Sequence, residues 1–336
     1  MTGSHPYEAL TPDVVLDALA SVGLYGDGRL MALSSYENRV YQAALEEAVE
    51  SHSQVVVKFY RPGRWSDEAI REEHAFAQAL AAEEVPAVAP LVLDGGTLHH
   101  HAGFAFSVSP RRGGRAPELD DEEVLEWIGR FLARIHTVGA KAPFAHRPML
   151  DLHGFGNEPR DWLLAHHMIP LDVESDWRKA CDAALAAVAQ ALGGQGGGYD
   201  PQLKLLRLHG DCHPGNILWT PDEGPHFVDL DDARTGPAVQ DLWMLMSGER
   251  AQRNRQLGAL LDGYEQVRDF DRRELALIEP LRTLRLIHYS AWLARRWDDP
   301  AFPAAFPWFG SSDYWKGQVQ MLEEQLEAMA EPPLVA

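Results

Sequence analysis

Alternating apolar and polar positions predict a group of β-strands in the first part of the chain. Six short runs favour extended structure and are separated by polar or glycine-containing turns, at residues 30–33, 40–45, 54–60, 91–93, 97–100 and 104–108. Such runs are typical of antiparallel strands. Among them, residues 66–82 begin with a Ser-Asp-Glu cap and carry apolar residues at helical spacing, which predicts one main helix.

Helical periodicity dominates the rest of the chain. Four long segments have this pattern, at about residues 120–139, 173–192, 239–297 and 314–330. The stretch from Ser109 to Arg115 combines Pro, Gly and Arg and separates the two kinds of pattern. We therefore predict an α+β fold with two lobes. We expect residues 1–109 to form a small antiparallel β-lobe and residues 110–336 to form a large, mostly helical lobe.

A turn-rich loop and the hairpin after it carry the candidate chemistry. Asp211 lies in the loop, Asn216 follows five residues later, and the second apolar run contains Asp229 and Asp231. Because these two acids alternate with apolar residues, we expect both carboxylates on one face of a strand. Phosphoryl transfer to a hydroxyl uses a carboxylate as base and amide and carboxylate oxygens for Mg²⁺. The alternative is a pair of ordinary turn formers beside a solvated strand face.

A lysine interrupts the most apolar of the predicted strands. Lys58 is either a charge on an edge strand or a ligand for phosphate. The predicted helix that follows offers Glu72 and Glu73 as ion-pair partners, and we prefer Glu73 because apolar residues continue its helical stripe. Ser35 lies in the turn at 34–39, which either cradles phosphate or is a plain polar hairpin.

Charge and composition narrow the classes of partner. The chain of 336 residues has a formal net charge of −20, so we expect binding to neither nucleic acid nor an anionic membrane. An ATP site in such a chain needs local cations or Mg²⁺. The cysteines, Cys181 and Cys212, indicate no disulfide framework. Without an apolar run of about 18 residues or a signal-peptide pattern, we expect a cytoplasmic protein.

The sequence segments around Asp211, Asn216, Asp229 and Asp231 resemble those of the aminoglycoside phosphotransferase and choline kinase superfamily, a branch of the protein-kinase-like fold. A closer resemblance is to the bacterial stress response kinase A family, in the segments Ser35–Tyr41, Val56–Pro62, Leu208–His213, Phe227–Arg234 and Asp241–Trp243. The resemblance implies a cytoplasmic Ser/Thr protein kinase of the stress response that uses ATP and Mg²⁺ on a protein substrate. We expect a monomer in which the lobe of residues 1–109 binds nucleotide and the lobe of residues 110–336 carries the catalytic and acceptor-binding residues. It also implies that Asp211 is the base, that Asn216 and Asp229 hold Mg²⁺, and that Ser35 lies at the ATP phosphates.

The same residues leave other classes open. A small-molecule kinase for an amino alcohol, a sugar or an aminoglycoside uses the same nucleotide apparatus. A non-catalytic nucleotide-binding module and a zinc hydrolase built on His209, Asp211 and His213 are further alternatives. Nine residues separate Asp231 from Asp241, too few for a long activation segment, so we expect no switching by phosphorylation there. We expect Asp241 to support the loop that carries Asp211.

Overall fold

The computed structural model describes residues 5–336 and divides the chain into two compact units. Unit 1 contains the chain up to Pro117 together with Phe144–Arg147 and Pro214–Ala233. Unit 2 contains Glu118–Pro143, Pro148–His213 and Arg234–Ala336. An antiparallel sheet dominates the N-terminal region and helices dominate the remainder, so the predicted α+β class is confirmed. The lobe boundary at residue 109 stays a prediction, and the compact units are discontinuous in sequence.

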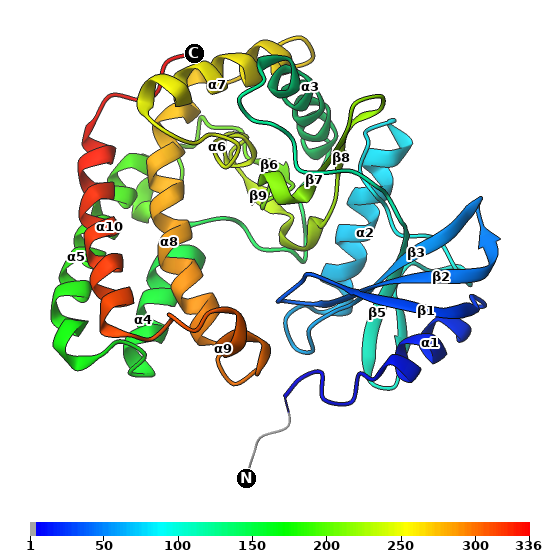
Figure 1. Ribbon diagram of the computed structural model, residues 1–336. Coiled ribbons are helices and arrows are strands. Elements are labelled where there is room, and N and C mark those ends of the chain that lie inside the picture. Colours follow the sequence, from blue (N-terminus) through cyan, green and yellow to red (C-terminus); the bar gives the residue numbers. More distant parts are fainter. Residues whose placement is uncertain (1–4) are drawn as a thin grey trace. The chain divides into compact units, whose positions relative to one another are not determined.

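A five-stranded sheet organises unit 1. Its strands are β1 (Gly26–Leu33), β2 (Arg39–Val49), β3 (His52–Phe59), β4 (His99–His101) and β5 (Phe104–Pro110), in the order β1-β2-β3-β5-β4 (Figure 1). The predicted run at 91–93 forms only an isolated bridge from Leu93 to Gly96. The chain reverses immediately after Leu93, because Asp94 and Gly95 both have positive φ angles, and this leaves no room for a longer strand.

Two helices and a hairpin complete unit 1. Thr11 caps α1 (Pro12–Ala20), which packs on β1 and β4, and Ser66 caps α2 (Asp67–Ala82) through the N–H of Ala69. The hairpin consists of β7 (Ile217–Thr220) and β8 (Gly224–Phe227) and follows the short turn η3 (Pro214–Asn216). The buried core of the sheet is mostly aliphatic and aromatic and includes Leu19, Val55, Val57, Phe59, Phe104 and Phe106.

Unit 2 is helical except for one small sheet (Figure 1). Its helices are α3 (Glu122–Gly139), α4 (Glu158–Ala165), α5 (Leu171–Leu192), α6 (Gln240–Trp243), α7 (Arg250–Tyr264), α8 (Ile278–Ala294), α9 (Ala301–Ala305) and α10 (Ser312–Ala330), with the shorter turns η1 (His153–Asn157), η2 (Gln195–Gly197) and η5 (Arg272–Leu277). Helices α3 and α7 approach each other closely at two glycines. A Cβ at Gly129 would overlap the carbonyl of Leu260, and one at Gly263 would overlap that of Glu126.

The small sheet of unit 2 lies beside the loop that carries Asp211. Strand β6 (Leu206–Leu208) leads directly into this loop and pairs with β9 (Arg234–Gly236), with Arg207 opposite Thr235. The nine residues between Asp231 and Asp241 therefore contain a paired strand and the approach to α6. In residues 5–336, no helix is both long enough and apolar enough to cross a bilayer.

Candidate active site

The segment after β8 differs from the predicted strand. Strand β8 ends at Phe227, Asp229 has the left-handed backbone conformation (φ 60°, ψ 66°), and the turn η4 (Leu230–Asp232) follows. The expectation that Asp229 and Asp231 share one strand face is therefore wrong, because the left-handed residue ends the alternation. Their environments differ accordingly: the Asp229 side chain is 48% exposed and that of Asp231 is 4% exposed.

Lys58 lies among three carboxylates of unit 1. Its Nζ is 2.9 Å from Asp229 Oδ1, 3.3 Å from Asp231 Oδ1 and 3.8 Å from Glu73 Oε1. Strand β3 supplies the lysine, helix α2 supplies Glu73, and the segment after β8 supplies both aspartates. Burial opposes the charge on Lys58, but attraction to Asp229, Asp231 and Glu73 holds the pKa of the ammonium well above its usual value. The lysine is therefore a fixed cation.

Asp231 is held by cations and an amide. Arg64 contacts Oδ2 of its carboxylate, and Asn38 Nδ2 donates to the same oxygen over 3.1 Å. The ammonium of Lys58 lies 3.3 Å from the other oxygen, Oδ1. A second nitrogen of Arg64 is 2.8 Å from Asp232. Burial would raise the pKa of Asp231, yet Arg64 and Lys58 keep it below the usual value. Asp231 thus acts as a buried anchor for Arg64 and Lys58, which leaves Asp229 as the open carboxylate.

Arg147, in a short segment far from α2 in sequence, binds several residues of this cluster. Arg147 Nη1 is 3.5 Å from Glu73 Oε2 and donates to the Ala69 carbonyl over 3.0 Å. The same guanidinium donates to the carbonyls of Ala233, over 2.6 Å, and Asp231. The Arg147 side chain is completely buried. It therefore joins α2 to the segment that carries Asp231.

The two neighbouring glutamates of α2 have separate roles. Glu73 lies between Lys58 and Arg147; burial raises its pKa while these two cations lower it, and the net direction is upward. Glu72 instead accepts the backbone N–H groups of Ala145, His146 and Arg147 over 2.6, 2.8 and 3.0 Å. Of these two glutamates, Glu73 is thus the one near Lys58, and Glu72 holds the segment that supplies Arg147.

Asn216 and Asp229 lie at the same end of the β7–β8 hairpin. The N–H of Val228 donates to the Asn216 carbonyl over 3.0 Å, which extends the pairing by one residue beyond both strands. An amide and an open carboxylate are ligand types that suit Mg²⁺, which keeps several waters and takes further oxygens from phosphates. Residues 5–336 contain no group of three or more His, Cys, Asp or Glu side chains that could enclose a metal. The amide of Asn216 and the carboxylate of Asp229 are a donor set that fits Mg²⁺.

In unit 2, Asp241 fixes the backbone of the loop that precedes Asp211. Its two carboxylate oxygens each accept one N–H over 2.8 Å, from His209 and Gly210. His136 Nε2 lies 3.1 Å from the same carboxylate, and His136 Nδ1 lies 2.9 Å from the Tyr264 hydroxyl. Burial opposes ionisation of Asp241, but the hydrogen bond from His136 and the Gly210 N–H lower its pKa. The expectation that Asp241 supports this loop is confirmed.

Asp211 has a cation beside it in unit 2. Its Oδ1 lies 2.7 Å from Arg285 Nη1 of helix α8, and its Oδ2 lies 3.6 Å from His213 Nε2. The Asp211 side chain is 20% exposed, and its Oδ1, which faces Arg285, is buried. Ser35, in unit 1, is half-buried in the loop between β1 and β2.

Comparison with known proteins assigns the chain to a family. Residues 30–278 match the model of the phosphotransferase enzyme family. The chain is 46% identical to "Serine/threonine protein kinase RdoA" of Salmonella typhimurium and 47% identical to "Stress response kinase A" of Escherichia coli, over 98% of this chain and 96% of each relative. It belongs to the stress response kinase A family. This membership confirms the resemblance found in the sequence strings.

Solved structures of several kinases share the fold of this protein at low sequence identity. One is the amicoumacin kinase hAmiN in complex with AMP-PNP, Ca²⁺ and Ami, with a TM-score of 0.69 and 18% identity over 98% of this chain and 96% of that chain. Another is a microcompartment-associated aminopropanol kinase, with a TM-score of 0.69 and 19% identity over 94% and 98%. These similarities show a kinase-like fold.

Three arginines that pair with candidate residues, two in unit 1 and one in unit 2, were missed in the sequence. Arg64 follows the Pro-Gly turn after β3, Arg147 lies in an irregular segment, and Arg285 lies in the middle of α8. Each is paired with an acid distant in sequence, and no local pattern reports such a pair. The only available signal was the excess of acids among the candidate residues, because buried carboxylates require cationic partners.

Proposed function

We propose that this protein is a serine/threonine protein kinase that transfers the γ-phosphoryl group of ATP to a protein hydroxyl with the help of Mg²⁺. The observation that carries the proposal is the position of Lys58 among Glu73, Asp229 and Asp231. A lysine held in this way has its charge fixed and can bind the α- and β-phosphates when Asp229 turns to a metal. The net charge of −20 makes such a local cation necessary for binding ATP.

Asn216 and Asp229 are the proposed Mg²⁺ ligands. When bound, the ion neutralises phosphate charge. Asp229 is the exposed member of its acid pair, so it can exchange Lys58 for a metal without unfolding a neighbour. Ser35 in the β1–β2 loop is the proposed phosphate contact, and the backbone at 107–109 of β5 is the proposed adenine contact.

Asp211 is the proposed general base, which orients the acceptor hydroxyl and takes its proton. The loop before it is preorganised, because Asp241 binds two consecutive N–H groups at 209 and 210. Asn216 follows Asp211 by five residues, so a single stretch of chain contributes the base and a metal ligand. Positioning of this kind supplies much of the rate in phosphoryl transfer.

Two observations favour a protein acceptor over a small cationic one. The relatives named above are described as a serine/threonine protein kinase and a stress response kinase. In addition, Arg285 lies 2.7 Å from Asp211 and puts a positive charge where an amino alcohol or aminoglycoside would need a negative one. A role in stress response and a monomeric, cytoplasmic form belong to the same proposal.

The test offers ATP labelled in the γ-position to a Ser/Thr peptide library and, in parallel, to amino alcohols, sugars and aminoglycosides, with and without Mg²⁺. We expect label on Ser or Thr, and loss of transfer when EDTA removes the metal. Asp211→Asn should slow transfer by about 10²–10⁴-fold with the fold intact. The matched control is Asp222→Asn in the exposed β7–β8 turn, which should transfer at the wild-type rate. Transfer to a small molecule alone would overturn the protein-kinase assignment.

A further inference from the structure

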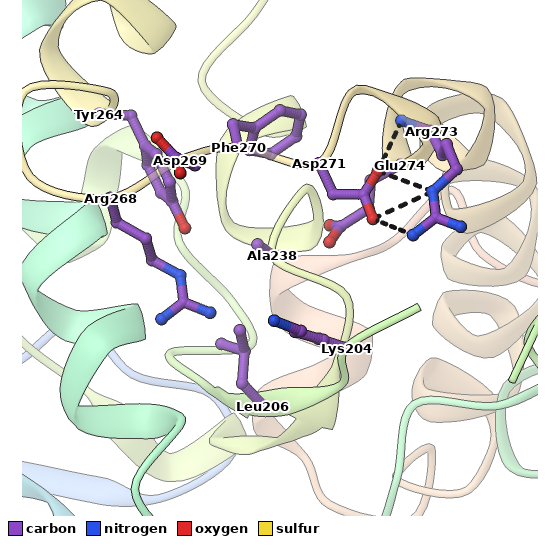
Figure 2. A pocket seen from close by; sticks show the side chains of 10 residues that line it. All are labelled: Lys204, Leu206, Ala238, Tyr264, Arg268, Asp269, Phe270, Asp271, Arg273 and Glu274. Atoms are coloured by element: carbon purple, nitrogen blue, oxygen red, sulfur yellow. Dashed lines mark hydrogen bonds and ion pairs between the residues drawn. The ribbon is translucent and has the colours of Figure 1, made fainter. Parts of the chain in front are cut away.

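Unit 2 contains a cavity of about 440 Å³ that is lined in part by the strand leading into the Asp211 loop. Its wall includes Leu206 at the start of β6, Ala238 before α6, and Tyr264 at the end of α7 (Figure 2). Its volume falls within the range of about 300–1,000 Å³ that is usual for small-molecule sites. None of the functions proposed above uses this cavity.

Two cations enter the cavity from different connecting segments, Lys204 from the segment before β6 and Arg268 from the turn after α7. Figure 2 shows the charged ends of Lys204 and Arg268 turned toward each other across the space above Leu206. Within residues 5–336, neither side chain has a carboxylate oxygen within ion-pair distance, that is, within 4.0 Å. Two cations that face each other in this way repel, and an anion placed between them would remove the repulsion.

The acids in the wall act on this pair of cations only from beyond ion-pair distance. The pKa of Asp271 is lowered mainly by Arg273 and to a smaller extent by Lys204, and Arg268 opposes the rise in the pKa of Glu274. Asp271 is engaged by Arg273, with an Nη2–Oδ2 distance of 2.6 Å and an Nε–Oδ1 distance of 2.9 Å. Glu274 is buried and accepts the N–H of Val239 over 2.9 Å. Burial, reinforced by the neighbouring Asp271, raises the pKa of Glu274 to about 7, so this carboxyl is partly neutral near pH 7. Asp269 is exposed at the rim.

We propose that this cavity is a binding site for a small organic phosphate, with the phosphate between Lys204 and Arg268 and the apolar body against Leu206 and Phe270. A phosphate monoester carries up to two charges and three acceptor oxygens, which suits an ammonium and a guanidinium approaching from two sides. The Tyr264 hydroxyl in the same wall is already engaged, since it lies 2.9 Å from His136 Nδ1 and interacts with Arg268. The apolar residues make an organic phosphate a better match than the free ion.

The cavity is connected to the catalytic loop through hydrogen bonds. From the wall, Tyr264 contacts His136, His136 contacts Asp241, and Asp241 binds the N–H groups at 209 and 210. By a second route, Glu274 holds the N–H of Val239, immediately before α6 and Asp241. A ligand that bridges the start of β6 and the turn after α7 should therefore restrain the loop. The ligand site is independent of the proposed kinase activity, and only its effect on turnover rests on that function.

Calorimetry of the full chain with phenyl phosphate tests the site, with a non-hydrolysable ATP analogue and Mg²⁺ present to fill any nucleotide site. We expect binding to the wild type and to Lys316→Gln, which removes an exposed cation of α10. Binding should weaken at least about tenfold in Lys204→Gln and in Arg268→Gln, since each removes one of the two charges. Benzoate, with the same ring and a carboxylate, should bind more weakly.

Amide hydrogen exchange supplies a readout that needs no catalytic activity. Phenyl phosphate should slow exchange in peptides that cover residues 206–210 in the wild type, and it should leave Arg268→Gln unchanged. Circular dichroism establishes that each variant is folded, and Arg268→Lys, which keeps the charge, should retain part of the binding. Absence of binding to the wild type, equal binding to Arg268→Gln, or benzoate binding as tightly as phenyl phosphate would overturn the assignment.

Discussion

The guanidinium of Arg285 lies 2.7 Å from the carboxylate of Asp211, the proposed base. The two residues come from α8 and from the loop after β6, so helix packing in unit 2 sets their distance. Arg285 is 39% exposed and remains accessible to a bound acceptor. This ion pair fixes one oxygen of the base and leaves the other near His213.

Substitution of Arg285 should therefore change turnover more than nucleotide affinity. We expect Arg285→Gln to lower kcat for the peptide acceptor about tenfold, because a base that is less well oriented accepts the proton less often in a productive geometry. The KM for ATP should change less than about twofold, and Arg285→Lys should restore part of the rate. Steady-state kinetics measures both constants. A variant with unchanged kcat would contradict the positioning role.

The control is Arg250→Gln, which breaks an exposed ion pair with Glu331 on another surface of unit 2. It should leave both kinetic constants at their wild-type values, since exposed pairs contribute about 0–1 kcal/mol.

Removal of the Lys58 charge should destabilise the fold as well as weaken nucleotide binding. Lys58→Met leaves Glu73 and Asp231, both buried, without one of their cations, and we expect a loss of roughly 3–5 kcal/mol in the free energy of unfolding. Glu73→Gln in the same background should recover part of this loss, because it removes one of the uncompensated charges. Urea unfolding of the four proteins in this cycle measures the coupling. Purely additive effects would show that the two side chains do not interact.

Arg147 should prove as important for stability as Lys58, although no substrate contact is assigned to it. Arg147→Met removes the donors to the carbonyls of Ala69 and Ala233 and the partner of Glu73, with an expected cost of roughly 3–5 kcal/mol. Arg147→Lys should not rescue it, because an ammonium lacks the planar fork. The control Arg71→Met on the exposed face of α2 should cost less than about 1 kcal/mol. Equal midpoints in urea for both methionine variants would refute the distinction.

Glu274 should make stability depend on pH in a definite direction. Its pKa rises from 4.5 to about 7 through burial and the neighbouring Asp271, against the opposing effects of Arg268 and the Val239 N–H. A raised folded-state pKa contributes stability below about pH 4.5 that is lost as the pH rises through about 7. Wild type should therefore lose up to about 3 kcal/mol relative to Glu274→Gln between about pH 5 and pH 8. Urea unfolding at both pH values tests it, and a constant difference between the two proteins would contradict it.

Local pattern predicted the strands and the main helix well, because β3 and α2 carry their own apolar periodicity and caps. The pattern also predicted that Lys58 and Glu73 are ion-pair partners. This was possible because a helix that directly follows a strand in the same compact unit has few places where it can pack. The pattern failed at Asp229, where alternation continues in the sequence while the backbone turns left-handed. It could not reveal Arg147, whose partners Glu73 and Ala233 lie 74 and 86 residues away. Pairing over such separations depends on tertiary packing.

The discontinuity of unit 1 has a consequence for the order in which the protein can be made. The sheet is synthesised early, but two parts of unit 1 come much later. One is Phe144, whose ring packs against Phe76, and the other is the β7–β8 hairpin, in which the N–H of Phe227 donates to the Pro86 carbonyl. A nascent chain that ends at residue 117 would leave Phe76 partly uncovered and Glu73 without Arg147. Unit 1 therefore cannot complete its core until residue 233 has been synthesised. Until then, the N-terminal part of the chain remains incompletely packed.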